Sequence, residues 1–108
     1  EEIFLRLATI YMEQERYEDI IALQSQEPEN LLTKWMIARS YQEIEDLDKA
    51  YELYQELSLD LKDNPEFLEQ YTYLLRELGY FEEAKVQAEA YLKLVPDDVQ
   101  MQELLETL

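Results

Sequence analysis

The sequence of 108 residues contains no cysteine and no histidine. Without cysteine the chain forms no disulfide and no thiolate metal site, so its stability has to come from packing and a reducing cytoplasm is the expected location. Without histidine, proton transfer at neutral pH would fall to Glu, Asp, Tyr or Lys, and an unperturbed carboxyl group is already ionised there. We therefore expect no enzymatic activity, no cofactor and no metal site.

Glycine and proline are scarce as well, with one glycine and three prolines, whereas 47% of the residues are hydrophobic. So little turn-forming material argues against a β protein and favours an all-helical domain. No stretch approaches the roughly 20 apolar residues of a membrane span. The acidic start Glu1-Glu2 also differs from the basic start of a secretory signal. We expect a single domain over residues 1–108, without a membrane partner.

Basic residues are few, with 9 Lys and Arg against 26 Asp and Glu and a formal net charge of -17. Such a chain repels phosphate backbones, so nucleic acid is not an expected partner. Two interpretations of the acidity remain open. It is either a solvated surface that keeps the protein soluble, or a surface that attracts a basic protein. The acids are spread evenly along the chain, which favours the first.

Apolar residues recur at helical spacing in seven segments, and no strand pattern is present. We expect helices over about 2–14, 17–27, 31–44, 47–61, 65–78, 81–95 and 99–108, the fourth being the longest. Asn30 is an expected N-cap, and so are Asp63 or Asn64, and Asp97 or Asp98. Gly79 is an expected C-cap. The short connections predict antiparallel neighbours.

The chain also repeats itself. Leu7-Ala8-Tyr11 recurs as Ile37-Ala38-Tyr41, and Leu47-Ala50 recurs as Phe81-Ala84. The clearest copy, 65–98, has Leu68, Tyr71, Thr72 and Leu75, then Gly79-Tyr80-Phe81-Glu82-Glu83-Ala84, then Tyr91 and Pro96. This order and spacing resemble the tetratricopeptide repeat, a 34-residue helix-turn-helix unit.

The resemblance implies a right-handed superhelical solenoid with repeats 1–30, 31–64 and 65–98 and a capping helix 99–108, as part of a longer repeat protein. Alanines such as Ala38 and Ala50 would let helices approach closely. The first repeat departs from the family pattern, because it is short and has Ile20 where the family prefers alanine. Its stacking is expected to be irregular.

In the family, the first helix of each repeat lines a concave groove that holds a peptide or helix of a partner. The resemblance places these residues there: Leu5, Thr9, Met12, Glu13, Leu32, Trp35, Arg39, Gln42, Glu43, Glu66, Glu69, Tyr73, Arg76 and Glu77. For four of them another role stays open. Trp35 is either core or an exposed anchor, Tyr73 is either a seam residue or an anchor, Met12 is either a gap filler or a contact, and Arg39 either binds a carboxylate or pairs with Glu43.

These features favour a non-catalytic scaffold that binds a protein or peptide. Capture of a chaperone's C-terminal carboxylate is not expected, because the basic and amide residues used for it are replaced by Leu5, Thr9, Met36, Glu66 and Gln70. The alternative is a structural role in which the chain associates with itself. Ile3, Phe4 and Ile10 would then form an apolar patch that drives dimerisation.

Overall fold

The computed structural model describes residues 2–108 and divides the chain into two compact units, Glu1–Leu57 (unit 1) and Ser58–Leu108 (unit 2). Unit 1 contains α1 (Glu2–Glu13), α2 (Tyr17–Ala22), the 3-10 turn η1 (Leu23–Gln26), α3 (Leu31–Glu43) and α4 (Leu47–Leu57). Unit 2 contains α5 (Pro65–Leu78), α6 (Phe81–Leu94) and α7 (Val99–Thr107). Over residues 2–108 there is no strand, so the all-helical prediction is confirmed.

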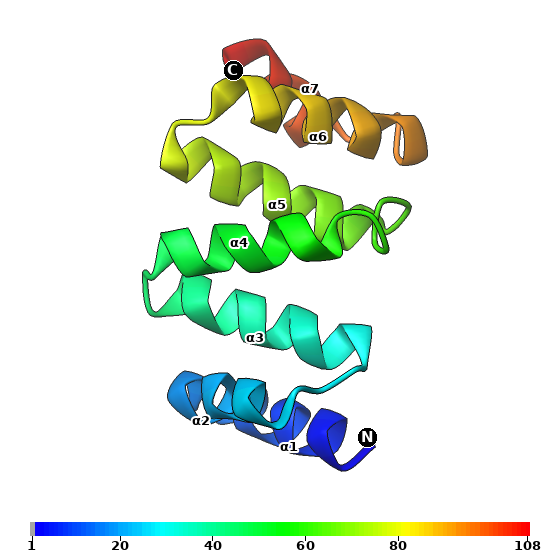
Figure 1. Ribbon diagram of the computed structural model, residues 1–108. Helices are drawn as coiled ribbons and strands as arrows, with labels where there is room; N and C mark the ends of the chain where they lie inside the picture. Colours follow the sequence, from blue (N-terminus) through cyan, green and yellow to red (C-terminus); the bar gives the residue numbers. More distant parts are fainter. Residues whose placement is uncertain (1) are drawn as a thin grey trace. The chain divides into compact units, whose positions relative to one another are not determined.

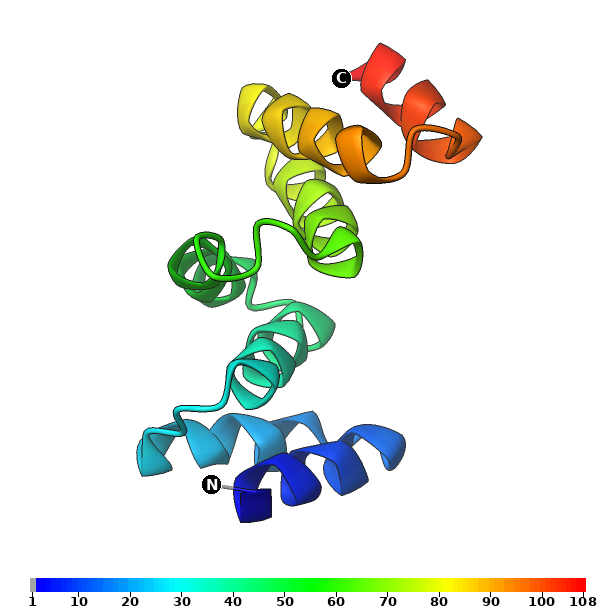
Figure 2. The same ribbon diagram turned by 90° about the vertical axis from the view of Figure 1, so that its right-hand side faces the viewer.

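Consecutive helices within each unit are antiparallel neighbours, as the short connections predicted (Figure 1). In unit 1, α1 packs against α2 and α3, and α3 packs against α4. In unit 2, α6 packs against both α5 and α7. Figure 2 shows the α3–α4 and α5–α6 pairs from a second direction. Helices that follow each other in sequence therefore bury their apolar stripes against each other.

The helix caps form at the residues that the sequence indicated. The Asn30 side chain accepts hydrogen bonds from the backbone N–H groups of Leu32 (2.9 Å) and Thr33 (3.2 Å). Asn64 accepts from the N–H of Phe67 (3.1 Å), so it is the cap of α5 and Asp63 is not. Each bond satisfies an N–H group that has no partner within its own helix.

The second and fourth helices end earlier than expected. The second ends at Ala22 and continues only as η1, after which Glu27 turns left-handed (φ 49°) before Pro28. The fourth ends at Leu57 and is shorter than α5 and α6, so the prediction that it is the longest is wrong. The segment that follows folds into turns, and Leu61 is buried there.

The three turns inside the helical pairs share one backbone conformation. Glu15 (φ 56°), Glu45 (φ 66°) and Gly79 (φ 81°) are all left-handed. The next residue in each turn donates its N–H to the carbonyl five residues back, for example Asp46 to Tyr41 O at 2.9 Å and Tyr80 to Leu75 O at 2.9 Å. This is the Schellman pattern at a helix C-terminus, which glycine adopts without strain.

Glu45→Gly is expected to raise the free energy of unfolding by about 0.5 to 1 kcal/mol, because the relief of left-handed strain exceeds the entropy that glycine loses on folding. Urea unfolding followed by circular dichroism measures the change. Gly79→Ala is the converse variant and should be destabilising by about 1 kcal/mol. A Cβ at Gly79 would have no heavy atom within 4 Å, so this variant reports backbone strain alone. A lower stability for Glu45→Gly would contradict the account.

Alanines form the contact points of the helical pairs. Ala8, Ala38 and Ala50 in unit 1 are 0% exposed, and so are Ala84 and Ala88 in unit 2. A methyl group at these positions lets two helix backbones approach to the short end of the usual 8 to 10 Å separation. Ile20, where the family prefers alanine, is also 0% exposed. The first repeat therefore accommodates a larger side chain at the same buried position.

Candidate protein-binding surfaces

Two parallel stripes of side chains lie on α1 and α3 of unit 1, at positions for which the sequence predicted a groove. Leu5, Thr9 and Met12 follow one face of α1 at i, i+4 and i+7 spacing, and Leu32 and Arg39 share one face of α3. Because α1 packs against α3, the stripes belong to neighbouring helices. Leu32 is 47% exposed, Thr9 is exposed, and Leu5, Met12, Arg39 and Gln42 are half-buried. The unit 1 inner face is defined by these six residues.

Trp35 lies in the core beneath this face. Its side chain is 7% exposed, and its indole N–H donates a hydrogen bond to the hydroxyl of Tyr54. The Tyr54 hydroxyl donates in turn to Gln42 Oε1 at 3.4 Å. Burial raises the pKa of Tyr54 to about 12, because the phenolate would be desolvated. Of the two roles left open for Trp35, its burial favours the core, where its hydrogen bond to Tyr54 links α3 to α4.

Arg39 lies close to two tyrosines and one glutamate. Its charge lowers the pKa values of Tyr17 and Tyr54, whereas Glu43 raises both. For Tyr17 the largest cause is desolvation, and the net direction is upward. The ion pair between Arg39 and Glu43 that the i, i+4 spacing suggested does not form, and Arg39 has no other ion pair with a residue from 3 to 108. Its guanidinium keeps donors for a ligand.

In unit 2 the predicted groove residues of α5 form a smaller cluster. The guanidinium of Arg76 lies over the ring of Tyr73, 5.3 Å from the centroid, in a cation–π contact. Tyr73 is half-buried and Arg76 is exposed. Of the three acidic positions predicted there, Glu66 and Glu77 are exposed and Glu69 is half-buried. One face of the Tyr73 ring is therefore already covered by the Arg76 guanidinium.

Tyr91 of α6 and Asp98 connect α6 to α7. The Tyr91 hydroxyl donates to Asp98 Oδ2 at 2.5 Å, and Asp98 Oδ1 accepts from the N–H of Met101 at 3.1 Å as the N-cap of α7. The bond to Asp98 is the largest cause that raises the pKa of Tyr91 to about 12, followed by burial. The same bond lowers the pKa of Asp98. One carboxylate thus both caps α7 and fixes it to α6.

The Tyr91–Asp98 bond should make part of the stability depend on alkaline pH. A tyrosine pKa raised from 10.0 to about 12 by folding contributes stability that is complete below pH 10 and is lost as the pH rises through 12. Tyr91→Phe should therefore flatten the decline of the urea midpoint between pH 10 and 12. The matched variant Tyr80→Phe, at an exposed position, should leave the decline as in the wild type. Equal slopes for Tyr91→Phe and the wild type would refute the coupling.

The comparisons with known proteins agree with this arrangement. The family model for YpiA-like, C-terminal tetratricopeptide repeats matches residues 32–98, which is more than half of the chain. The chain belongs to this family. Among solved structures, the tetratricopeptide fold matches the first TPR of Spaghetti (RPAP3) bound to the HSP90 peptide SRMEEVD. The TM-score is 0.79 at 17% sequence identity, over 97% of this chain and 89% of the other. No curated protein matches the sequence.

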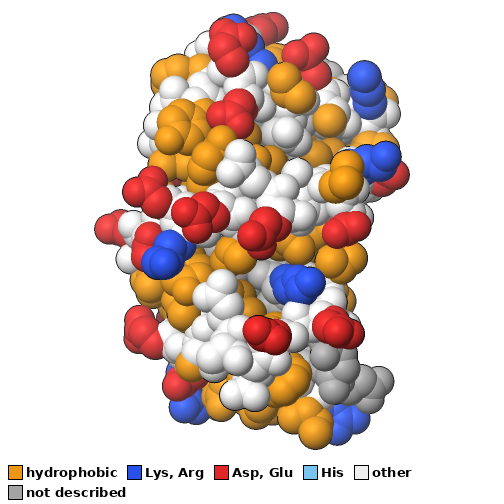
Figure 3. All heavy atoms as spheres, in the orientation of Figure 1, with side chains coloured by type: hydrophobic (Ala, Val, Ile, Leu, Met, Phe, Trp, Pro, Cys, Tyr) orange, Lys and Arg blue, Asp and Glu red, His pale blue; other side chains and the backbone are white. Residues whose placement is uncertain are grey.

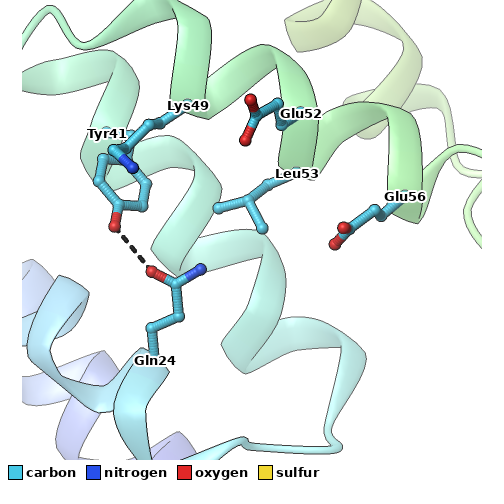
Figure 4. Close-up of a pocket in the computed structure, with 6 residues that line it drawn as sticks. All are labelled: Gln24, Tyr41, Lys49, Glu52, Leu53 and Glu56. Atoms are coloured by element: carbon cyan, nitrogen blue, oxygen red, sulfur yellow. Dashed lines mark hydrogen bonds between the residues drawn. The ribbon is translucent and has the colours of Figure 1, made fainter.

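The tetratricopeptide chain also has a small polar cavity of about 140 Å³ on the other side of α3, which the sequence did not predict (Figure 4). It is lined by Gln24, Tyr41, Lys49, Glu52, Leu53 and Glu56. The Tyr41 hydroxyl donates to Gln24 Oε1 at 2.7 Å across it. Gln24 lies in η1, the 3-10 turn that follows the second helix. A helical pattern read from the sequence does not contain that information.

The part of the chain that the structure describes shows neither a metal site nor a membrane-spanning helix. Within residues 3–108, no three Asp or Glu side chains gather in a group that could hold a metal ion. None of the helices over the same residues has the length and apolar character that crossing a membrane requires. On the face drawn in Figure 3, acidic side chains are scattered among apolar and basic ones. The distribution agrees with the interpretation of the acids as a solvated surface.

Proposed function

We propose that this tetratricopeptide chain is a non-catalytic scaffold that binds a peptide or helix of a partner protein on the unit 1 inner face. The observation that carries the proposal is the exposed Leu32 beside the half-buried Leu5 and Met12 on two neighbouring helices. Apolar side chains in such positions gain free energy when a partner removes them from water. The buried Trp35 and Gln42 of the face are linked through hydrogen bonds to the Tyr54 hydroxyl. Tyr73 and Arg76 of α5 offer a further contact region in unit 2.

The proposal is tested with a phage-displayed library of random 12-residue peptides selected on the wild-type chain. Selected peptides are synthesised, and their affinities are measured by isothermal titration calorimetry. The double variant Thr9→Glu/Leu32→Glu should bind them at least about tenfold more weakly, because two charges would have to be desolvated in the contact. Both sites are exposed, so the fold should be retained.

A matched control is Val86→Glu on α6, which is 61% exposed and lies outside the proposed face. It should bind the selected peptides with wild-type affinity. Equal binding by all three proteins, or loss caused by Val86→Glu alone, would overturn the proposal. Circular dichroism at 222 nm shows whether each variant keeps its helices, so weaker binding is not confused with unfolding.

Self-association is a second candidate that one observation favours. Ile3 is 67% exposed and Ile10 is 47% exposed, seven residues apart on one face of α1, although Phe4 is half-buried. A second copy of the chain could cover this stripe. Light scattering at increasing protein concentration should then give the mass of a dimer, and Ile3→Lys/Ile10→Lys should give a monomer. A wild-type monomer of 13.1 kDa at every concentration would rule this candidate out.

A further inference from the structure

The acidic residues are absent from two parts of the sequence that the fold brings together. The two longest stretches without Asp or Glu are residues 3–12 and 30–42. The first lies within α1, the second lies almost entirely within α3, and these two helices pack against each other. The charges in these stretches are Arg6, Lys34 and Arg39. α1 and α3 together carry three bases and three acids, so in a chain with a net charge of -17 this pair of helices is neutral, with its acids at the helix ends.

The other helices have more acids than bases. α4 has Asp48, Glu52 and Glu56 against Lys49, and α7 has Glu103 and Glu106 with no base. α5 has three glutamates against Arg76, and α6 has three against two lysines. The charge at the unit 1 inner face is therefore a local property. Because the Debye length is about 8 Å at physiological ionic strength, this local charge outweighs the distant acids for a bound ligand.

Arg39 is the cation within the unit 1 inner face. It is half-buried, and it has no ion pair with any residue from 3 to 108. A guanidinium that has lost part of its hydration and has no carboxylate partner gains when a carboxylate arrives, through charge-assisted hydrogen bonds. The acids on these helices lie at their ends, with Glu2 at the start of α1, Glu13 at its end and Glu43 at the end of α3. The first turn of α3 has no acid, so its N-terminal end, which favours negative charge, is open to an acidic ligand.

We infer that the partner segment bound by the unit 1 inner face is apolar and acidic, with apolar side chains on Leu5, Met12 and Leu32 and a carboxylate on Arg39. The inference rests on the proposed function and adds the charge of the partner. It differs from the basic partner that the net charge had left open as one of two interpretations. It also differs from capture of a chain's terminal carboxylate, since an internal Asp or Glu satisfies it.

The test uses two phage-displayed libraries of equal length with the same apolar positions. One has Glu and the other has Lys at the polar positions. The wild-type chain should enrich the Glu library. For the enriched Glu peptides, Arg39→Gln should weaken binding about threefold to tenfold, whereas Arg39→Lys should retain most of the affinity. Lys93→Gln, which removes an exposed positive charge from α6, is the matched control and should have no effect.

The outcomes separate this inference from the proposed function. Enrichment of the Lys library, with binding abolished by Thr9→Glu/Leu32→Glu, would overturn the acidic partner and keep the binding face. Equal enrichment of both libraries, with no effect of Arg39→Gln, would show a purely apolar contact and also overturn the inference. Peptides that are unaffected by Thr9→Glu/Leu32→Glu would overturn the proposed function together with the inference.

Discussion

Replacing Trp35 by alanine is expected to lower the free energy of unfolding by about 3 to 5 kcal/mol, the usual cost of deleting a buried aromatic ring. The ring is 7% exposed, so its removal leaves a cavity between α3 and its neighbours. The variant also deletes the hydrogen bond from the indole N–H to Tyr54, a residue with 0% exposure. A buried hydroxyl that loses a partner adds to the cost. The loss approaches the whole stability of a small domain.

Urea unfolding followed by circular dichroism measures this loss, since the tryptophan itself is absent from the variant. Trp35→Phe keeps most of the volume and should cost clearly less than Trp35→Ala. Phe81→Ala is the control, because Phe81 is 49% exposed and its removal should cost much less. A loss below about 1 kcal/mol for Trp35→Ala would mean that the ring is not part of the core.

Enlarging Ala50 is expected to have the second-largest effect. Ala50 lies on α4, which packs against α3, and it is 0% exposed. Leucine at this position would force the two helices apart or push neighbouring side chains out of their rotamers, at a cost of about 1 to 3 kcal/mol. The thermal midpoint of Ala50→Leu should fall by several degrees.

Ala22→Leu is the matched control for Ala50→Leu. Ala22 ends α2 and is exposed, so the same enlargement meets no packed neighbour and should change stability by no more than about 0.5 kcal/mol. An unchanged midpoint for Ala50→Leu would contradict the alignment of this residue with the small positions of the repeat.

The features predictable from sequence were those that depend on a few adjacent residues. The Asn30 side chain caps the N-terminus of α3, and Gly79, which has no side chain, adopts the left-handed conformation at the C-terminus of α5. Both roles depend little on the rest of the chain. The buried alanines were predictable because the repeat places the same small residue at the same register. The left-handed turns at Glu15 and Glu45 could have been found in the same way, from their alignment with Gly79.

Features that depend on packing were not predictable. Leu59 and Leu61 continue the apolar spacing of α4, but both lie after the helix ends. Leu61 is buried although it lies in a turn segment, and Leu59 is 78% exposed. Trp35 is buried and hydrogen-bonds Tyr54 of α4, a contact between two helices that the pattern of one helix does not show. The missing ion pair between Arg39 and Glu43 was not predictable either, because i, i+4 spacing allows such a pair without requiring it. For the candidate face, the sequence indicated the positions but not their exposure.

The central claim is that partner segments bind to the face formed by α1 and α3. It is tested most directly by two-dimensional ¹H–¹⁵N NMR of the labelled chain titrated with a peptide from the random library. The account predicts that the amide shifts of Leu5, Thr9, Met12, Leu32 and Arg39 change most, while those of Val86 and its neighbours on α6 remain in place. Shifts confined to α6, or to the cavity between η1 and α4, would contradict it.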